Sequence, residues 1–176
     1  MKAHAITDKK IIDAISDHLR EGSVRNYLMF RIGLNLGVTV QELLSLTIED
    51  VLDKDFFVNE EGYKVCISPS LQEDIENCVG ARREGLLFIS RNGLPISRCH
   101  LYTILNRAAS EVGMKDQISA LSLRKTFAYW AYKENEQILP TLSCYLKHQT
   151  LEQTLSYIGV DDGLHENELE ISAVDL

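Results

Sequence analysis

Three residues in the last third of the chain have the chemical types that phosphodiester transfer through a tyrosine requires. Arg124 lies in a short segment, 121–126, and His148 and Tyr157 lie in a second segment, 147–157. A tyrosine oxygen can attack a phosphodiester and hold the strand covalently, so that the bond is resealed without ATP or metal. The fork of an arginine donates paired hydrogen bonds to a phosphate, and a histidine moves protons. The order of these residues therefore predicts a phosphoryl-transfer site.

The composition is that of one globular domain with a sizeable core. The chain has 176 residues, of which 45% are hydrophobic, and no apolar run approaches the roughly 18 residues that span a bilayer. Residues 1–8 contain no apolar stretch like that of a signal peptide. We therefore expect a cytoplasmic protein that does not insert into membranes.

The four cysteines indicate neither a disulfide framework nor a zinc site. They are Cys66, Cys78, Cys99 and Cys144. They are widely separated and form no Cys-x-x-Cys pair, so we expect small buried hydrophobes in a reducing compartment. The other histidines also lack metal-ligand spacing. The sequence therefore predicts no metal and no cofactor.

The negative charge is concentrated at the C-terminal end. The net charge is −8, which is unfavourable for binding a polyanion. Six of the acidic residues follow Tyr157, where no Lys or Arg occurs: Asp161, Asp162, Glu166, Glu168, Glu170 and Asp175. The sequence thus divides into a nearly neutral domain, 1–160, and an acidic tail, 161–176. Long-range attraction of this chain to DNA should be weak.

Hydrophobic periodicity predicts a mainly helical domain with one small antiparallel β-sheet. Apolar spacing and capping residues place helices at 7–22, 25–35, 40–46, 68–79 and 121–134, from 97, from 140, and at 151–158. Two β-rich segments, 56–58 and 63–67, flank a turn and predict a hairpin. Residues 86–89 are a candidate for a further short strand.

The order of these motifs resembles the catalytic domain of the tyrosine recombinases, the phage integrase family. Residues 37–46 are similar to the family segment Gly-Leu-Arg-x-x-Glu-Leu-x-x-Leu, and 121–127 to the box His-x-Leu-Arg-His-Thr-Phe. Residues 146–157 resemble the box Leu-Gly-His…Thr-x-x-Tyr. The resemblance covers about residues 6–160, and it implies the DNA breaking-and-rejoining fold of that family.

The resemblance also implies roles for individual residues. Tyr157 would be the nucleophile that forms a 3′-phosphotyrosine, while Arg124 and His148 would stabilise charge and move protons. Lys64 falls near the hairpin position of the family's lysine, although it is shifted toward the second strand. Arg124, Lys125 and Lys147 would contact DNA.

Two positions depart from the family pattern. Thr39 stands where the first arginine is expected, and Leu121 stands where the first histidine of the second box is expected. Removal of one well-placed transition-state donor costs about 10² to 10³ in rate. Lys125 would replace only part of the charge lost at Leu121. We therefore expect a degenerate catalytic set and inefficient strand cleavage.

Each matched residue also has a purely structural interpretation. Tyr157 would be a core tyrosine, as many of the seven tyrosines must be. His148 would be the C-terminal cap of the preceding helix, because imidazolium interacts well with the last carbonyls. Arg124 would be a partly buried arginine paired with a carboxylate such as Glu42.

Three functional hypotheses follow. The first is a recombinase-like protein of mobile-element type, which binds DNA and has a regulatory or accessory role in recombination or integration with weak or no cleavage. The second is an active recombinase or integrase that uses Tyr157. The third is a protein-interaction module without DNA binding.

The partners expected from this reading are DNA and other recombinase subunits. DNA affinity should be low and salt-sensitive, because the family's N-terminal DNA-binding domain has no counterpart in this sequence. By the resemblance, the segment after Tyr157 would dock on a neighbouring copy or on a recombinase partner.

Overall fold

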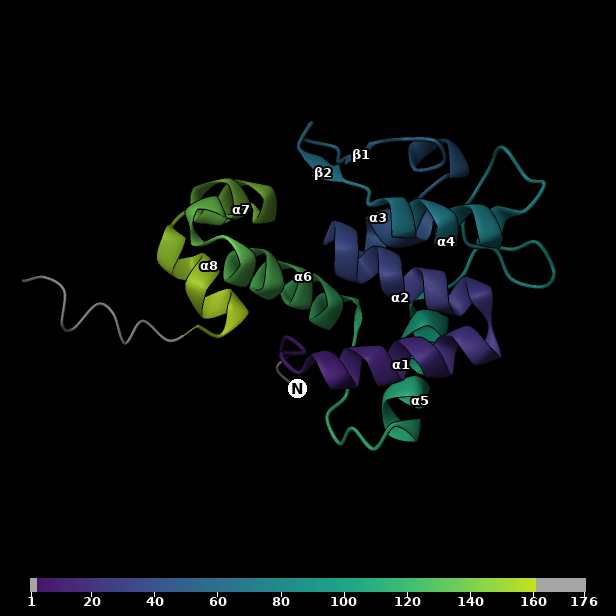
Figure 1. Cartoon of the computed structure of the whole chain (residues 1–176), viewed down its shortest axis with the longest axis horizontal. Helices are drawn as coiled ribbons and strands as arrows, with labels where there is room; N and C mark the ends of the chain where they lie inside the picture. The colour runs from purple at the N-terminus through teal and green to yellow at the C-terminus, as the bar shows by residue number, and fades with distance from the viewer. Residues whose placement is uncertain (1–2, 161–176) are drawn as a thin grey trace, which may run out of the picture.

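The computed structural model describes residues 3–160, which form a helical domain with one β-hairpin (Figure 1). The first five elements are α1 (Lys9–Gly22), α2 (Val24–Leu36), α3 (Val40–Ser45), the 3₁₀ turn η1 (Ile48–Asp50) and β1 (Phe56–Val58). They are followed by β2 (Lys64–Cys66), α4 (Pro69–Val79), α5 (Arg98–Glu111) and α6 (Ala120–Glu134). The last are the 3₁₀ turn η2 (Glu136–Ile138), α7 (Leu139–Leu146) and α8 (Leu151–Ile158). The predicted mainly helical class with a small antiparallel sheet is confirmed.

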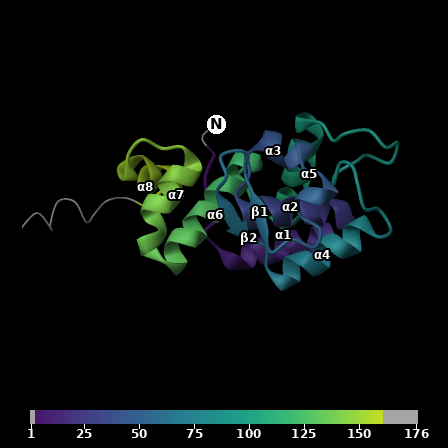
Figure 2. The same cartoon turned by 90° about the horizontal axis from the view of Figure 1, so that it is seen from above.

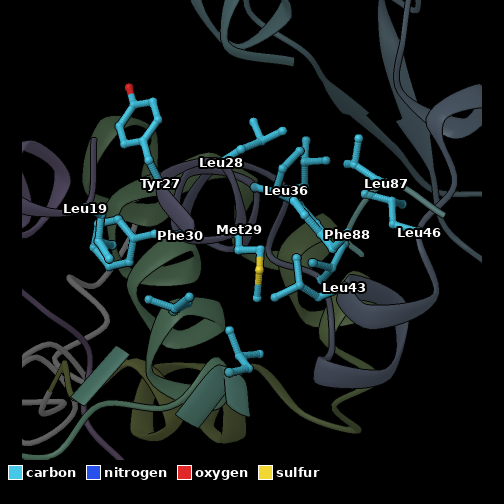
Figure 3. Packing of buried hydrophobic residues seen from close by; sticks show 14 of the residues in the cluster. Leu19, Tyr27, Leu28, Met29, Phe30, Leu36, Leu43, Leu46, Leu87 and Phe88 are labelled. Atoms are coloured by element: carbon cyan, nitrogen blue, oxygen red, sulfur yellow. The ribbon is translucent and has the colours of Figure 1, made fainter. Parts of the chain in front are cut away.

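Helix α2 is the centre of the larger hydrophobic core. It contacts α1, α4 and α6, and it buries apolar residues on most of its circumference, as a core helix does. Leu28, Met29 and Phe30 are fully buried in consecutive positions (Figure 3). Leu43 of α3 and Phe88 of the loop before α5 pack into the same cluster.

Helix α6 connects the larger core to a second, smaller one. Its first half packs Leu123 against α2, and its second half supplies Ala128 and Tyr132 to a cluster with α7 and α8. Figures 1 and 2 show α7 and α8 together at one end of the molecule, joined to the rest through α6. The backbone of Ile6 further pins the N-terminal segment to α6, by hydrogen bonds with Thr126 and Trp130.

The hairpin pairs Phe57 with Val65, and the side chains of these two residues point toward the protein interior. Because side chains alternate along a strand, Lys64 and Cys66 then face solvent. The candidate strand at 86–89 is wrong. This segment makes only two isolated bridges, at Leu86 and at Ile89.

The expectation of buried cysteines is also wrong. Cys66, Cys99 and Cys144 are exposed, and Cys78 is half-buried. The predicted cap of the first helix is wrong by one residue, because Asp8 rather than Thr7 caps it. The acidic tail, 161–176, lies outside the described residues. Between residues 3 and 160, no helix combines the length and the apolar character needed to cross a bilayer.

Gly37 sets the distance between the end of α2 and helix α6. Its φ is +60°, a left-handed conformation that favours glycine. A Cβ atom at this position would lie 2.1 Å from Cδ1 of Phe127. This close approach brings residues 38–42 against the face of α6 that carries Arg124.

Substitution of Gly37 tests this packing. We expect Gly37→Ala to lower the free energy of unfolding by about 3 kcal/mol, since it combines left-handed strain with overpacking. The control Gly113→Ala has a φ of +78° but open space around its Cβ, so it should lose only about 1 kcal/mol. Urea denaturation followed by circular dichroism measures both values, and equal losses would contradict the packing argument.

Candidate functional site

Arg124 lies at the start of α6, where it is held from two sides. Ser119 caps the helix, and the Arg124 side chain is only 12% exposed. Its Nη2 donates a hydrogen bond to the carbonyl of Tyr145 at 3.3 Å. Its Nη1 lies 3.7 Å from Oε2 of Glu42. The ion pair with Glu42 that the sequence suggested is therefore present.

Thr39 and Glu42 form a capping box at the start of α3. The Thr39 hydroxyl accepts a hydrogen bond from the Glu42 N–H at 3.1 Å, and the Thr39 N–H donates to Glu42 Oε2 at 2.7 Å. The same carboxylate oxygen is thus shared by the Thr39 backbone and by Arg124. The residue in place of the family's first arginine caps a helix and orients a carboxylate toward the arginine that remains.

His148 does not cap α7 with its imidazole. The left-handed residue Lys147 ends the helix, and the backbone N–H of His148 donates to Ser143 at 3.0 Å. The imidazole points instead to α8, where its Nδ1 lies 2.9 Å from Oγ1 of the buried Thr154. The ring meets that of Tyr157 edge-on, with centroids 4.9 Å apart.

The Tyr157 ring lies between His148 and Lys125. The Lys125 ammonium is 4.6 Å from the centre of the Tyr157 ring, within the range of a cation–π contact. Burial raises the pKa of the Tyr157 hydroxyl, and the charge of Arg124 opposes this rise. The phenol is therefore protonated at neutral pH and requires a base before it can attack.

The imidazole of His148 is neutral at pH 7. Its burial, and then the charges of Arg124 and Lys125, lower its pKa below the ordinary 6.5. A neutral imidazole can accept a proton, so the pair of His148 and Tyr157 has the protonation states of a base and a nucleophile. The two rings are in contact, Lys125 lies over the Tyr157 ring, and the charge of Arg124 acts on both His148 and Tyr157.

A cleft of about 300 Å³ opens beside Arg124, between α3, the hairpin turn and the α7–α8 connection. Its charged lining residues are three carboxylates and three cations: Glu42, Glu60, Glu61, Arg98, Arg124 and Lys147. Lys147 and Glu61 form an ion pair across it. The cleft is therefore formally neutral, unlike the positively charged pocket that a phosphate prefers.

Lys64 and Leu121 lie outside the cleft. Lys64 is on the exposed face of β2 with its ammonium 5.9 Å from the Phe56 ring, and it does not line the cleft. Its position gives no support to a catalytic role. Leu121 is 49% exposed on the first turn of α6. Lys125 is buried, so it faces Tyr157 instead of the surface.

Glu60 and Glu61 of the cleft were missed in the sequence. The two glutamates were interpreted only as part of a turn, between Asn59 and Gly62. The signal that was available is their place in the hairpin, where the family resemblance expects a lysine. In residues 3–160, no three metal-ligating side chains converge.

The sequence pattern of the phage integrase family matches residues 6–163. The chain belongs to the phage integrase family. It is 32% identical, over 158 residues, to a Bacillus subtilis (strain 168) protein named "Probable integrase/recombinase YoeC", covering 86% of both chains. It is 25% identical to the tyrosine recombinase XerH of Campylobacter jejuni, covering 88% of this chain and 47% of XerH. The chain thus spans only about half the length of XerH.

Solved structures of tyrosine recombinases share the fold. The XerA recombinase superposes with a TM-score of 0.75 at 17% identity, covering 94% of this chain and 64% of XerA. XerH bound to its difH substrate gives a TM-score of 0.72 at 18% identity, covering 97% of this chain and 55% of XerH. A lambda integrase dimer bound to a core site gives 0.68 at 15% identity, covering 93% and 62%. The recombinase fold predicted from the motifs is therefore confirmed.

The titration of His148 tests the electrostatics of the site. We expect its NMR titration midpoint to lie below pH 6.5, and to rise in Arg124→Gln because the protonated ring then loses a repulsive neighbour. Lys133→Gln, on the exposed part of the same helix, should leave the midpoint unchanged. A wild-type midpoint above pH 6.5, or a midpoint that is the same in wild type and Arg124→Gln, would show that the His148 ring lies in a different environment.

Proposed function

We propose that this chain binds DNA in a recombination or integration reaction and cleaves it weakly or not at all. Membership of the phage integrase family supports the link to recombination. The structures of XerH and lambda integrase described above contain DNA, which supports DNA as the partner. The observation that carries the proposal of weak cleavage is the role of Thr39, which caps α3 at the position where the family pattern has its first arginine.

Two groups of the family pattern that this chain lacks explain why cleavage should be poor. A phosphoryl transition state gains negative charge on its non-bridging oxygens, and donors aimed at those oxygens are usually the largest catalytic contribution. Glu42, which matches a glutamate of the family pattern, pairs with the Arg124 guanidinium and orients it. Thr39 supplies no second guanidinium, and exposed Leu121 neither gives nor takes a proton. Of the two arginines in the family pattern, the matched segments retain Arg124.

A second candidate, an active recombinase, is favoured by one specific observation. His148 is neutral, contacts Tyr157 directly, and is oriented by Thr154. Lys125 adds a positive charge against the face of the Tyr157 ring. This half of the site retains the groups that a tyrosine nucleophile requires.

The third candidate, a protein-interaction module without DNA binding, rests on charge. The cleft is formally neutral, and the whole chain carries a net charge of −8. Neither feature attracts a polyanion over long distances.

A suicide substrate tests cleavage directly. We expect no covalent protein–DNA adduct on a denaturing gel after incubation with a nicked half-site, because the transition state lacks its electrostatic support. An adduct that disappears in Tyr157→Phe would establish the active recombinase instead.

The double variant Thr39→Arg, Leu121→His is the matched gain-of-function control. It returns the two absent groups, and any adduct it forms should also require Tyr157. Thr39 caps α3, and loss of an N-cap costs about 1 kcal/mol of stability. The circular dichroism spectrum of the double variant must therefore first match that of the wild type.

Fluorescence anisotropy with a labelled duplex tests DNA binding. We expect binding at about 50 mM salt that weakens about 10- to 40-fold by about 200 mM, as two or three phosphate contacts require. Arg98→Gln, in the cleft, should reduce the slope of log affinity against log salt by about one. Lys10→Gln, on exposed α1, should not. Absence of binding at low salt would leave the interaction module.

A further inference from the structure

The turn between β1 and β2 is built to hold two carboxylates at the cleft. Asn59 is only 7% exposed, and its side-chain oxygen accepts hydrogen bonds from the N–H groups of Glu61, at 3.2 Å, and Tyr63, at 2.8 Å. Tyr63 packs edge-on against Tyr145 of α7, with ring centroids 6.3 Å apart. We call residues 59–63 the acidic turn. Its conformation is fixed at the base by these contacts.

Glu61 of the acidic turn pairs with Lys147, which occupies the left-handed position at the end of α7. The hydrogen bond with Lys147 lowers the pKa of the Glu61 carboxyl, and the charge of Arg124 lowers it further. The same hydrogen bond raises the pKa of the Lys147 ammonium. Glu61 and Lys147 are therefore both charged at neutral pH. The Glu61 carboxylate interacts favourably with two cations, Lys147 and Arg124.

The two paired carboxylates of the cleft differ in how firmly they are held. Glu42 belongs to the capping box of α3, so its departure from Arg124 would also break the helix cap. Glu61 and Lys147 have side chains that are 32% and 61% exposed. Exposed ion pairs are screened by water and salt and are individually weak. Glu61 is thus the carboxylate that an incoming anion can displace.

We propose that the acidic turn is a gate on the cleft: Glu61 occupies, as an internal carboxylate, the place of a DNA phosphate at Lys147. This inference rests on the proposed DNA-binding function and adds its regulation. An incoming phosphate displaces the Glu61 side chain, and Lys147 then exchanges one anion for another. In the closed form Lys147 adds little to DNA affinity, because its charge is already paired.

The gate predicts a specific pattern in duplex binding by anisotropy. Glu61→Gln should tighten binding about three- to fivefold, the range of a weak ion pair, and should do so only when Lys147 is present. In a Lys147→Gln background the same change should have almost no effect. The control Glu76→Gln removes an equal charge from exposed α4, outside the cleft, and should change affinity by less than about twofold.

A second measurement separates the gate from DNA binding. Inorganic pyrophosphate is titrated while the amide NMR signals of Lys147 and His148 are followed. Glu61→Gln should bind pyrophosphate more tightly than wild type or Glu76→Gln. If this holds while no variant binds DNA, the gate stands and the proposed function fails. If Glu61→Gln equals Glu76→Gln in both measurements, or its effect persists without Lys147, the gate is overturned.

Discussion

One carboxylate oxygen organises the candidate site. Glu42 Oε2 accepts the Thr39 N–H and faces the Arg124 guanidinium, so a helix cap and an ion pair share a single atom. The cap fixes the carboxylate, and the carboxylate fixes the orientation of the arginine. Because a partly buried arginine needs a partner for its charge, this oxygen adds a polar constraint on α3 and α6 to their apolar packing.

The two halves of the site belong to different cores. Thr39 and Glu42 are positioned by packing around α2, whereas His148 lies in the α7–α8 connection and Tyr157 in α8. Helix α6 joins them, and the Tyr145 hydroxyl reinforces the joint by donating a hydrogen bond to the Leu36 carbonyl at the end of α2. Residues close in the sequence determine the geometry within each half. The distance between the two halves is set by α6 and the elements packed against it.

The sequence predicted what local patterns determine. Helix α8 was placed at its observed bounds, since capping by Thr150 and apolar spacing agree there. The proximity of His148 and Tyr157 followed from the matched boxes. Lys64 could have been assigned to the solvent face from strand alternation, because Val65 faces inward. The orientation of Glu61 toward the cleft could not have been predicted from the sequence. It depends on the contact of Tyr63 with Tyr145, which joins distant segments of the chain.

Thr39 is well suited to its place at the start of α3. Threonine is among the preferred residues at a helix N-terminus, whereas a long cationic side chain there opposes the helix dipole. Leu121 lies on the surface, so the packing of the core does not depend on which side chain occupies this position. At both positions the residues found are neutral or favourable for folding, and neither carries a charge. At these two positions the fold is therefore compatible with the absence of the charged side chains of the family pattern.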